Sequence, residues 1–101
     1  MIIYNVTTKV SWEINDVWLE WMKSEHIPQM LQTGCFFDSR ILRLLEIDDD
    51  EGPTYAVQYH ASGNDKYSEY LQQHAAVLRK HAHAKWGTQI ISFRSVMEVL
   101  H

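Results

Sequence analysis

The architecture is set by the stretch IIYNVTTKVSWEINDVWLEWMK (residues 2–23), because its hydrophobic period changes from two to about 3.6 partway along. Over residues 2–10, apolar side chains occupy one side of the chain at Ile2, Tyr4, Val6 and Val10. This alternation predicts a β-strand. From Glu13 onward the apolar residues follow helical spacing instead, at Ile14, Val17, Trp18, Trp21 and Met22. A strand is therefore expected to lead into an amphipathic, aromatic helix.

Proline and glycine predict how this first helix ends. Pro28 disfavours helical geometry at Ile27, so we expect a break there and a short helical turn that restarts at Pro28. Gly34 is expected to end that turn in the left-handed conformation, which glycine adopts without a steric penalty.

The rest of the chain continues the order of strands and helices. Residues 36–47 and 54–61 predict two strands of a hairpin, joined by an acidic turn. A second helix is predicted from about residue 65 to about residue 83, with Gly87 ending it. Residues 88–100 predict the last strand.

This order of elements predicts one α+β domain spanning residues 1–101. With right-handed crossovers, it gives the ferredoxin-like βαββαβ fold, a four-stranded antiparallel sheet with two helices on one face. A chain of 101 residues has the length of a single domain with one core.

The sheet face away from the helices predicts a partner. In a monomer that face should be polar, yet the second and last strands carry apolar residues on both of their sides. One member of each of three pairs must point there: Phe36 or Phe37, Ile41 or Leu42, and Ile90 or Ile91. We therefore expect a homodimer in which the open sheet face packs against the same face of a second copy.

Charge and composition exclude other partners. The formal charge of −4 comes from the acidic turn at residues 48–51, and the remaining charges cancel. Without a basic stripe, binding to nucleic acid is not expected. No apolar run has the roughly 18 residues that a membrane crossing requires, so no membrane association is expected. Cys35 is the single cysteine, and the first residues lack the features of a secretory signal, so we expect a cytoplasmic protein.

Six stretches carry a resemblance to a known family: MIIYNV (1–6), WLEWMK (18–23), HIP (26–28), TYAVQY (54–59), HAAVLR (74–79) and FRSVMEVL (93–100). Together they span nearly the whole chain and resemble an uncharacterised family of short bacterial proteins, classed only as a domain of unknown function. More distantly, the order of elements is similar to the dimeric α/β-barrel proteins, which include antibiotic-biosynthesis-type monooxygenases, haem-degrading enzymes and muconolactone isomerases.

The histidines do not predict a metal site. His74 and His81 share a helix face but are about 10.5 Å apart along its axis, and His81 and His83 point to nearly opposite sides. A zinc site would need His60 or His26 to arrive from another element. We therefore expect neither a metal nor a cofactor.

Candidate ligand-binding residues are the amide side chain of Asn5 on the first strand and several aromatic and imidazole side chains of the predicted helices. They are Asn5, Trp21, His26, Tyr67, His74 and His81. No set of residues forms a catalytic signature, but Asn5, His74 and His81 are the candidates for catalysis. The resemblance to haem-degrading enzymes implies an Asn on the first strand, a His on the second helix and a nearby Trp, and no Trp of this chain matches that third position.

Two classes of function follow. The first is a dimeric module that binds a small-molecule ligand or another protein. The second is a cofactorless monooxygenase or a haem-degrading type of enzyme that uses Asn5 with His74 or His81. A pocket that contains both Asn5 and a histidine of the second helix would favour the enzyme.

Overall fold

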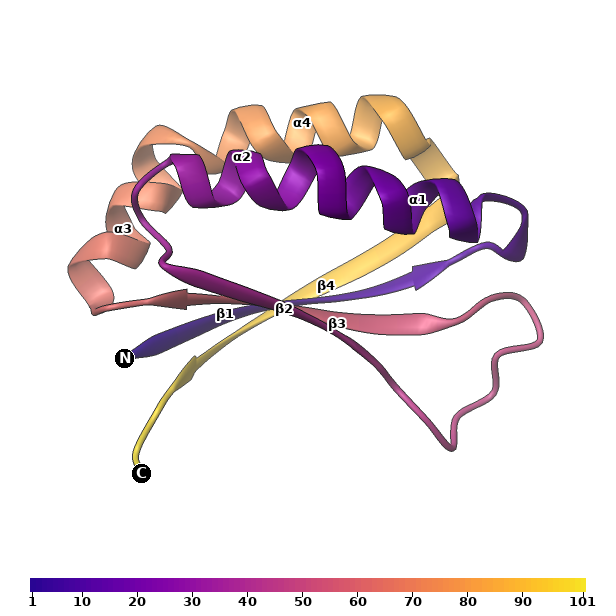
Figure 1. Ribbon diagram of the computed structural model, residues 1–101, viewed down its shortest axis with the longest axis horizontal. Coiled ribbons are helices and arrows are strands. Elements are labelled where there is room, and N and C mark those ends of the chain that lie inside the picture. Colours follow the sequence, from indigo (N-terminus) through magenta and orange to yellow (C-terminus); the bar gives the residue numbers. More distant parts are fainter.

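Four strands form one antiparallel sheet in the computed structural model, which describes all of residues 1–101. The strands are β1 (Ile2–Val10), β2 (Asp38–Arg43), β3 (Thr54–Ala61) and β4 (Ile90–Glu98). Their order is β2-β3-β1-β4, which places the first strand in the centre. Figure 1 shows the helices in one layer over one face of this sheet. The predicted α+β, ferredoxin-like βαββαβ fold is confirmed.

The first helical segment of the chain is longer and more continuous than the sequence predicts. A 3-10 turn, η1 (Trp12–Ile14), leads into α1 (Asn15–Trp21), a π-helical segment η2 (Met22–His26) and α2 (Ile27–Gln32). The predicted break at Ile27 is wrong, because Ile27 keeps helical dihedral angles of φ −61° and ψ −46°. Pro28 lies in the first turn of α2, where its missing N–H is tolerated. Burial of Met22 and Met30, one on each side of the proline, outweighs the local preference for a break.

The second helix shows the opposite difference, because it is divided where continuity was predicted. It consists of α3 (Asn64–Gln73) and α4 (Ala75–Trp86), which run in different directions (Figure 1). His74 lies between them with a φ of −127° and a ψ of −31°. The predicted left-handed conformation of Gly34 is confirmed by its φ of 77°, and α4 ends at Trp86, directly before Gly87, as predicted. A short 3-10 turn, η3 (Gly87–Gln89), then leads into β4.

The core lies between the helices and the sheet and is rich in aromatic rings. Tyr4, on the central strand, is 1% exposed and packs against rings from several elements. Those rings are Phe36, Tyr59, Tyr67 and Tyr70, with centroids 5.3–6.0 Å from that of Tyr4. The sheet therefore packs against α3 through these rings. Since side chains alternate along a strand, the even-numbered residues of β1 point toward the helices.

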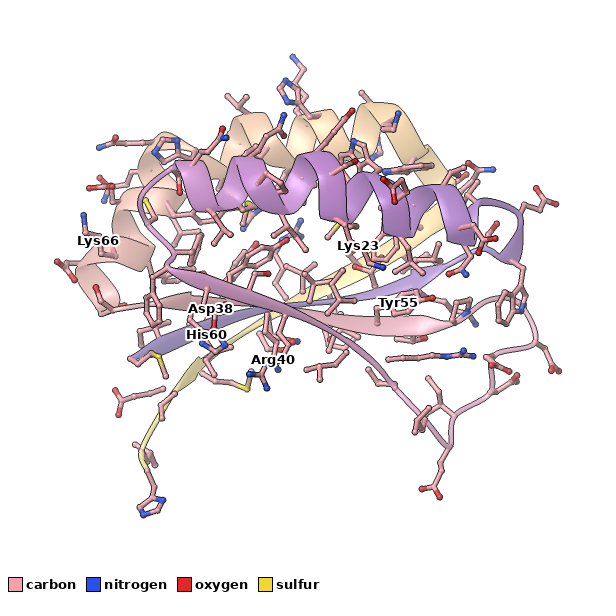
Figure 2. All side chains as sticks on the ribbon, viewed as in Figure 1. Lys23, Asp38, Arg40, Tyr55, His60 and Lys66 are labelled. Carbon is pink, nitrogen blue, oxygen red and sulfur yellow. The ribbon has the colours of Figure 1, made fainter.

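The opposite face of the sheet is uncovered in the single chain. Phe37, Leu42 and Ile91 are the members of the three predicted pairs that are exposed there, together with Phe93 and Met97. Figure 2 shows Arg40 and His60 on this same side, away from the helices. The prediction that apolar side chains project from both faces of the sheet is therefore confirmed. No helix combines the length and apolar character needed to cross a membrane.

Candidate functional site

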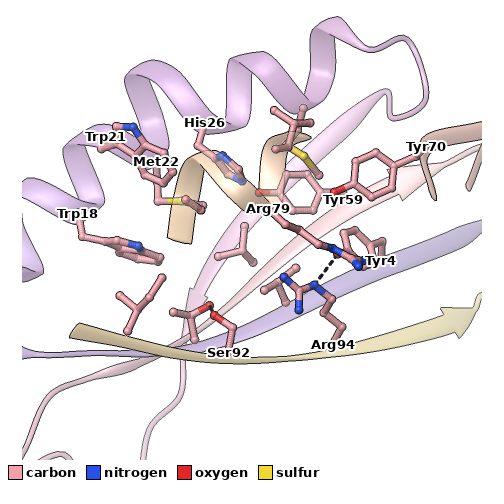
Figure 3. Close-up of a pocket in the computed structure, with 17 residues that line it drawn as sticks. Tyr4, Trp18, Trp21, Met22, His26, Tyr59, Tyr70, Arg79, Ser92 and Arg94 are labelled. Carbon is pink, nitrogen blue, oxygen red and sulfur yellow. Dashed lines mark hydrogen bonds between the residues drawn. The ribbon is translucent and has the colours of Figure 1, made fainter. Parts of the chain in front are cut away.

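A pocket lies between the helix layer and the sheet, at the level of the central strand. It is lined by 17 residues, 12 of them hydrophobic, so its walls are mostly apolar. Its cavity volume is about 70 Å³, whereas a single water needs about 10–15 Å³ on the same scale. The pocket therefore has room for several waters or for part of a small organic molecule. Figure 3 shows the side chains that surround it.

Two arginines from different elements meet at one hydroxyl group in this pocket. Arg79 of α4 donates a hydrogen bond from Nη2 to the hydroxyl oxygen of Tyr4 at 3.1 Å, and Arg94 of β4 donates one from Nε to the same oxygen at 2.9 Å. Figure 3 shows both guanidinium groups beside the labelled Tyr4 ring. Two positive charges are thus held next to each other around a neutral acceptor.

Neither arginine has an acidic partner. The salt bridges of the molecule join Arg43 to Asp49 and Lys66 to Glu69, both at the surface. The Nε of Arg79 is buried and makes no hydrogen bond. The guanidinium groups of Arg79, which is partly buried, and Arg94, which is exposed on β4, lie next to each other. Both have N–H groups that could donate hydrogen bonds to a negatively charged oxygen.

His26 adds an imidazole to the same pocket, from the π-helical segment η2. Its ring stacks on Trp21 with centroids 4.8 Å apart, and its Nδ1 is buried without a hydrogen-bond partner. Burial, assisted by the charge of His81, lowers the pKa of His26 from 6.5 to about 4. The imidazole is therefore neutral near pH 7.

The structure brings some of the predicted binding residues together. Trp21 and His26 both line the pocket, and Tyr67 packs against Tyr4 at its edge. His81 lines a separate, open hollow beside Trp21. His74 lies in another hollow, near the junction of α3 and α4.

Asn5 is not part of this arrangement. Consecutive residues of a strand point to opposite faces, and Tyr4 faces the helices, so Asn5 lies on the open face. Its amide donates a hydrogen bond to Thr7 of the same face at 2.9 Å. A pocket that combines Asn5 with His74 or His81, the arrangement that would favour an enzyme, is not formed, because the sheet separates Asn5 from both histidines.

The two arginines were missed at the sequence level, although a signal existed. Arg94 follows Ser92 on the side of β4 that faces the helices, and Arg79 follows the buried Leu78 on α4. Neither has an acidic residue at a pairing distance along its own element. A cation on an inward-facing side of an element without a local acid is the pattern that would have identified them.

A second group of polar side chains lies outside the pocket. Cys35, Glu69 and His74 each place one potential ligand atom within 4.8 Å of the other two. Burial and the hydrogen bond to Glu69 raise the pKa of the Cys35 thiol. In the metal-free chain the thiol is protonated at neutral pH, which does not favour Cys35 as a nucleophile.

Comparisons with known proteins identify a family for the chain and a solved structure with a similar fold. The family model described as "Domain of unknown function (DUF4286)" matches residues 1–100. The crystal structure of an ethyl tert-butyl ether d (EthD) family protein from Bacillus halodurans C-125 is similar, with a TM-score of 0.65 at 12% identity over 99% of this chain and 100% of that one. At this identity the similarity concerns the fold. No curated protein matches the chain in sequence.

Proposed function

The chain belongs to the family described as a domain of unknown function, DUF4286, and within that family we propose that it binds a small organic anion in the pocket between the helices and the sheet. The observation that carries the proposal is the meeting of Arg79 and Arg94 at the Tyr4 hydroxyl without any acidic partner. Neighbouring positive charges at a pocket repel each other unless an anion lies between or beside them. A ligand that carries a carboxylate would supply that charge.

Guanidinium geometry favours an oxygen anion. A guanidinium group presents parallel N–H donors that match the two oxygens of a carboxylate. Arg79 retains a buried donor at Nε, and the nitrogens of Arg94 other than Nε make no hydrogen bond within the protein. Both arginines can therefore bind a carboxylate without giving up the Tyr4 hydroxyl.

The walls of the pocket define the rest of the ligand. Away from the arginines the lining is aromatic and aliphatic, with Trp18, Trp21, Met22, Met30 and Val57. Such surfaces bind apolar groups by removing them from water. The ligand class that fits is a short aromatic or branched carboxylic acid, whose acid group lies at the arginines and whose body lies below α1 and η2.

The positions of Asn5, His74 and His81 do not favour the enzyme alternative. A cofactorless monooxygenase or haem-degrading type of enzyme would have used Asn5 with His74 or His81, and the sheet lies between these residues. A binding module makes use of the groups that do share a pocket.

We further propose that the chain works as a homodimer through the open sheet face. Ile91 and Phe93 of β4 are 70% and 63% exposed, and Leu42 of β2 and Phe37 beside it are exposed at the other edge. Apolar side chains at both edges of one face suit a twofold partner, because the same surface then covers itself. The proposed location is the cytoplasm, where a free thiol such as that of Cys35 persists.

Binding of benzoate, compared with the neutral benzamide, tests the ligand class. We expect benzoate to change the fluorescence of Trp18 and Trp21 saturably, and benzamide of the same shape to bind at least tenfold more weakly. Replacing Arg79 with Met should weaken benzoate binding roughly 10- to 100-fold, because hydrogen bonds to charged groups contribute about 1.5–3 kcal/mol.

A matched control is available on the open face. Arg40→Met removes an arginine outside the pocket and should leave benzoate binding unchanged. Equal binding of benzoate and benzamide, or equal losses in the Arg79 and Arg40 variants, would overturn the proposal.

A further inference from the structure

Cys35, Glu69 and His74 come from three separate parts of the chain and converge at one end of the helix layer. Cys35 follows the Gly34 cap of α2, Glu69 lies in α3, and His74 lies at the junction of α3 and α4. The Sγ of Cys35 donates a hydrogen bond to Oε2 of Glu69 at 3.1 Å, and an imidazole nitrogen of His74 is within 4.8 Å of both.

The donor set is one that transition metals bind. Thiolate, imidazole and carboxylate are the three protein ligands of Zn²⁺, with bonds of about 2.0–2.3 Å. Two such bonds at a tetrahedral angle place ligand atoms about 3.3–3.8 Å apart. At 3.1 Å, Sγ of Cys35 and Oε2 of Glu69 lie slightly closer together than that, so metal binding needs a small separation of these two atoms and a closer approach of His74, through rotations about the side-chain bonds of Glu69 and His74.

The local backbone places His74 for this role. An unbroken helix would continue from α3 through residue 74, but His74 leaves the helical conformation there. Its imidazole takes part in none of the side-chain hydrogen bonds of the structure. The nitrogen lone pair is therefore free for a ligand.

A surface hollow reaches one member of the cluster, His74. The hollow that contains His74 is lined largely by polar side chains, among them Thr33, Gln29 and Gln73. An ion can approach through it, and a water molecule can remain as a fourth ligand. Three protein ligands with one open position is the arrangement of zinc sites that keep an exchangeable water.

We propose that Cys35, Glu69 and His74 form a binding site for a divalent transition metal ion, with Zn²⁺ as the ion that best fits the three donors. This site is separate from the anion pocket, and no residue is shared between them. A bound ion would connect the end of α2 to the junction of α3 and α4. It would therefore stabilise the folded chain and hold the orientation of α4, which carries Arg79.

Titration with Co²⁺, which occupies zinc sites and is coloured, tests the proposal. We expect one Co²⁺ per chain and a thiolate-to-cobalt charge-transfer band in the near ultraviolet. The band should be absent in Cys35→Ser. Glu69→Gln and His74→Ala should each weaken Co²⁺ binding at least tenfold.

His81→Ala is the matched control, since it removes a second histidine of the same helical region that lies outside the cluster. It should leave the band and the affinity unchanged. Glu69 is partly exposed, so Glu69→Gln remains informative if the buried Cys35 substitution impairs folding. Zn²⁺ should raise the melting temperature of the wild-type chain and not that of Glu69→Gln.

Three results would overturn the site. They are the absence of the charge-transfer band in the folded wild-type chain, a Co²⁺ affinity of folded Cys35→Ser equal to that of the wild type, and equal losses of affinity in the His74 and His81 variants. In each case the thiol and carboxylate would be only a hydrogen-bonded pair. Benzoate binding, measured on the same variants, separates this outcome from a failure of the anion pocket.

Discussion

Tyr4 is the residue on which the proposed anion site depends. Its ring is fixed by contacts with Phe36 and Tyr70, and its hydroxyl accepts hydrogen bonds from both arginines. Because the ring is almost fully buried, the hydroxyl has little freedom to move. A fixed acceptor holds both guanidinium groups in place before a ligand arrives, which reduces the entropy lost on binding.

Substitution of Tyr4 with Phe removes this acceptor and keeps the ring. We expect the free energy of unfolding to fall by about 1–2 kcal/mol, since two partly buried donors lose their acceptor, and benzoate affinity to fall several-fold. Urea denaturation and fluorescence titration measure the two effects. Tyr67→Phe is the control, because the Tyr67 hydroxyl makes no hydrogen bond to either arginine. Losses as large in Tyr67→Phe would contradict the role given to the Tyr4 hydroxyl.

His26 predicts a pH dependence of stability. Its pKa is about 4 in the folded chain and 6.5 when unfolded, so the unfolded state binds a proton more readily between these values. The contribution is present above pH 6.5 and is lost as the pH falls toward 4. About 2 kcal/mol should be lost between pH 7 and pH 5.

The variant His26→Gln separates the contribution of His26 to this loss of stability from the contributions of the other groups that bind protons in this pH range. Urea denaturation at pH 7 and pH 5 should show a smaller fall in unfolding free energy for His26→Gln than for the wild type. His83→Gln, at an exposed position of α4, should behave like the wild type. Identical pH profiles for the wild type and His26→Gln would show that His26 is not buried in its neutral form.

At the scale of elements, hydrophobic period predicted the strands and helices well, and local breaking signals predicted their interruptions poorly. The alternation of residues 2–10 and the helix ends at Gly34 and Gly87 follow from local chemistry, which the sequence contains. The continuity past Pro28 and the bend at His74 depend on contacts with the sheet. Those contacts are long-range, so a local pattern does not contain them.

The acidic turn between β2 and β3 gives a prediction at this scale, because Gly52 lies against β1. A Cβ atom at Gly52 would be 1.8 Å from the carbonyl oxygen of Val10. Gly52→Ala should therefore displace the turn and lower the free energy of unfolding by about 3 kcal/mol. Urea denaturation measures the loss.

Gly34→Ala is the comparison, since Gly34 also has a positive φ but has open space around its Cβ position. It should cost only the strain of the left-handed conformation, about 1 kcal/mol. Equal costs at the two glycines would mean that the turn moves away from Val10 without difficulty.

At the scale of the whole molecule, the two faces of the sheet have different roles. One face forms the core and the pocket, and the other presents exposed apolar side chains. The sequence predicted this division, because apolar residues on both sides of a strand are visible in a pattern of period two. It did not predict the pocket, because Tyr4, Arg79 and Arg94 are brought together only by the order β2-β3-β1-β4.

The mass in solution tests the proposed homodimer. Light scattering should give about twice the chain mass of 11.9 kDa. Phe93→Arg should give the mass of a single folded chain, because a charge is costly to bury in an apolar interface. Val77→Arg, at an exposed position on α4, should leave the mass unchanged. A wild-type chain that is monomeric at high concentration would contradict the dimer.

The anion site is tested most directly by nuclear magnetic resonance of the arginine side chains. With ¹⁵N-labelled protein, addition of benzoate should shift the Nε–H signals of Arg79 and Arg94 saturably and leave that of Arg40 unchanged, while benzamide should shift none of them. If benzoate leaves the signals of Arg79 and Arg94 in place, or shifts all arginine signals alike, the pocket does not bind a carboxylate.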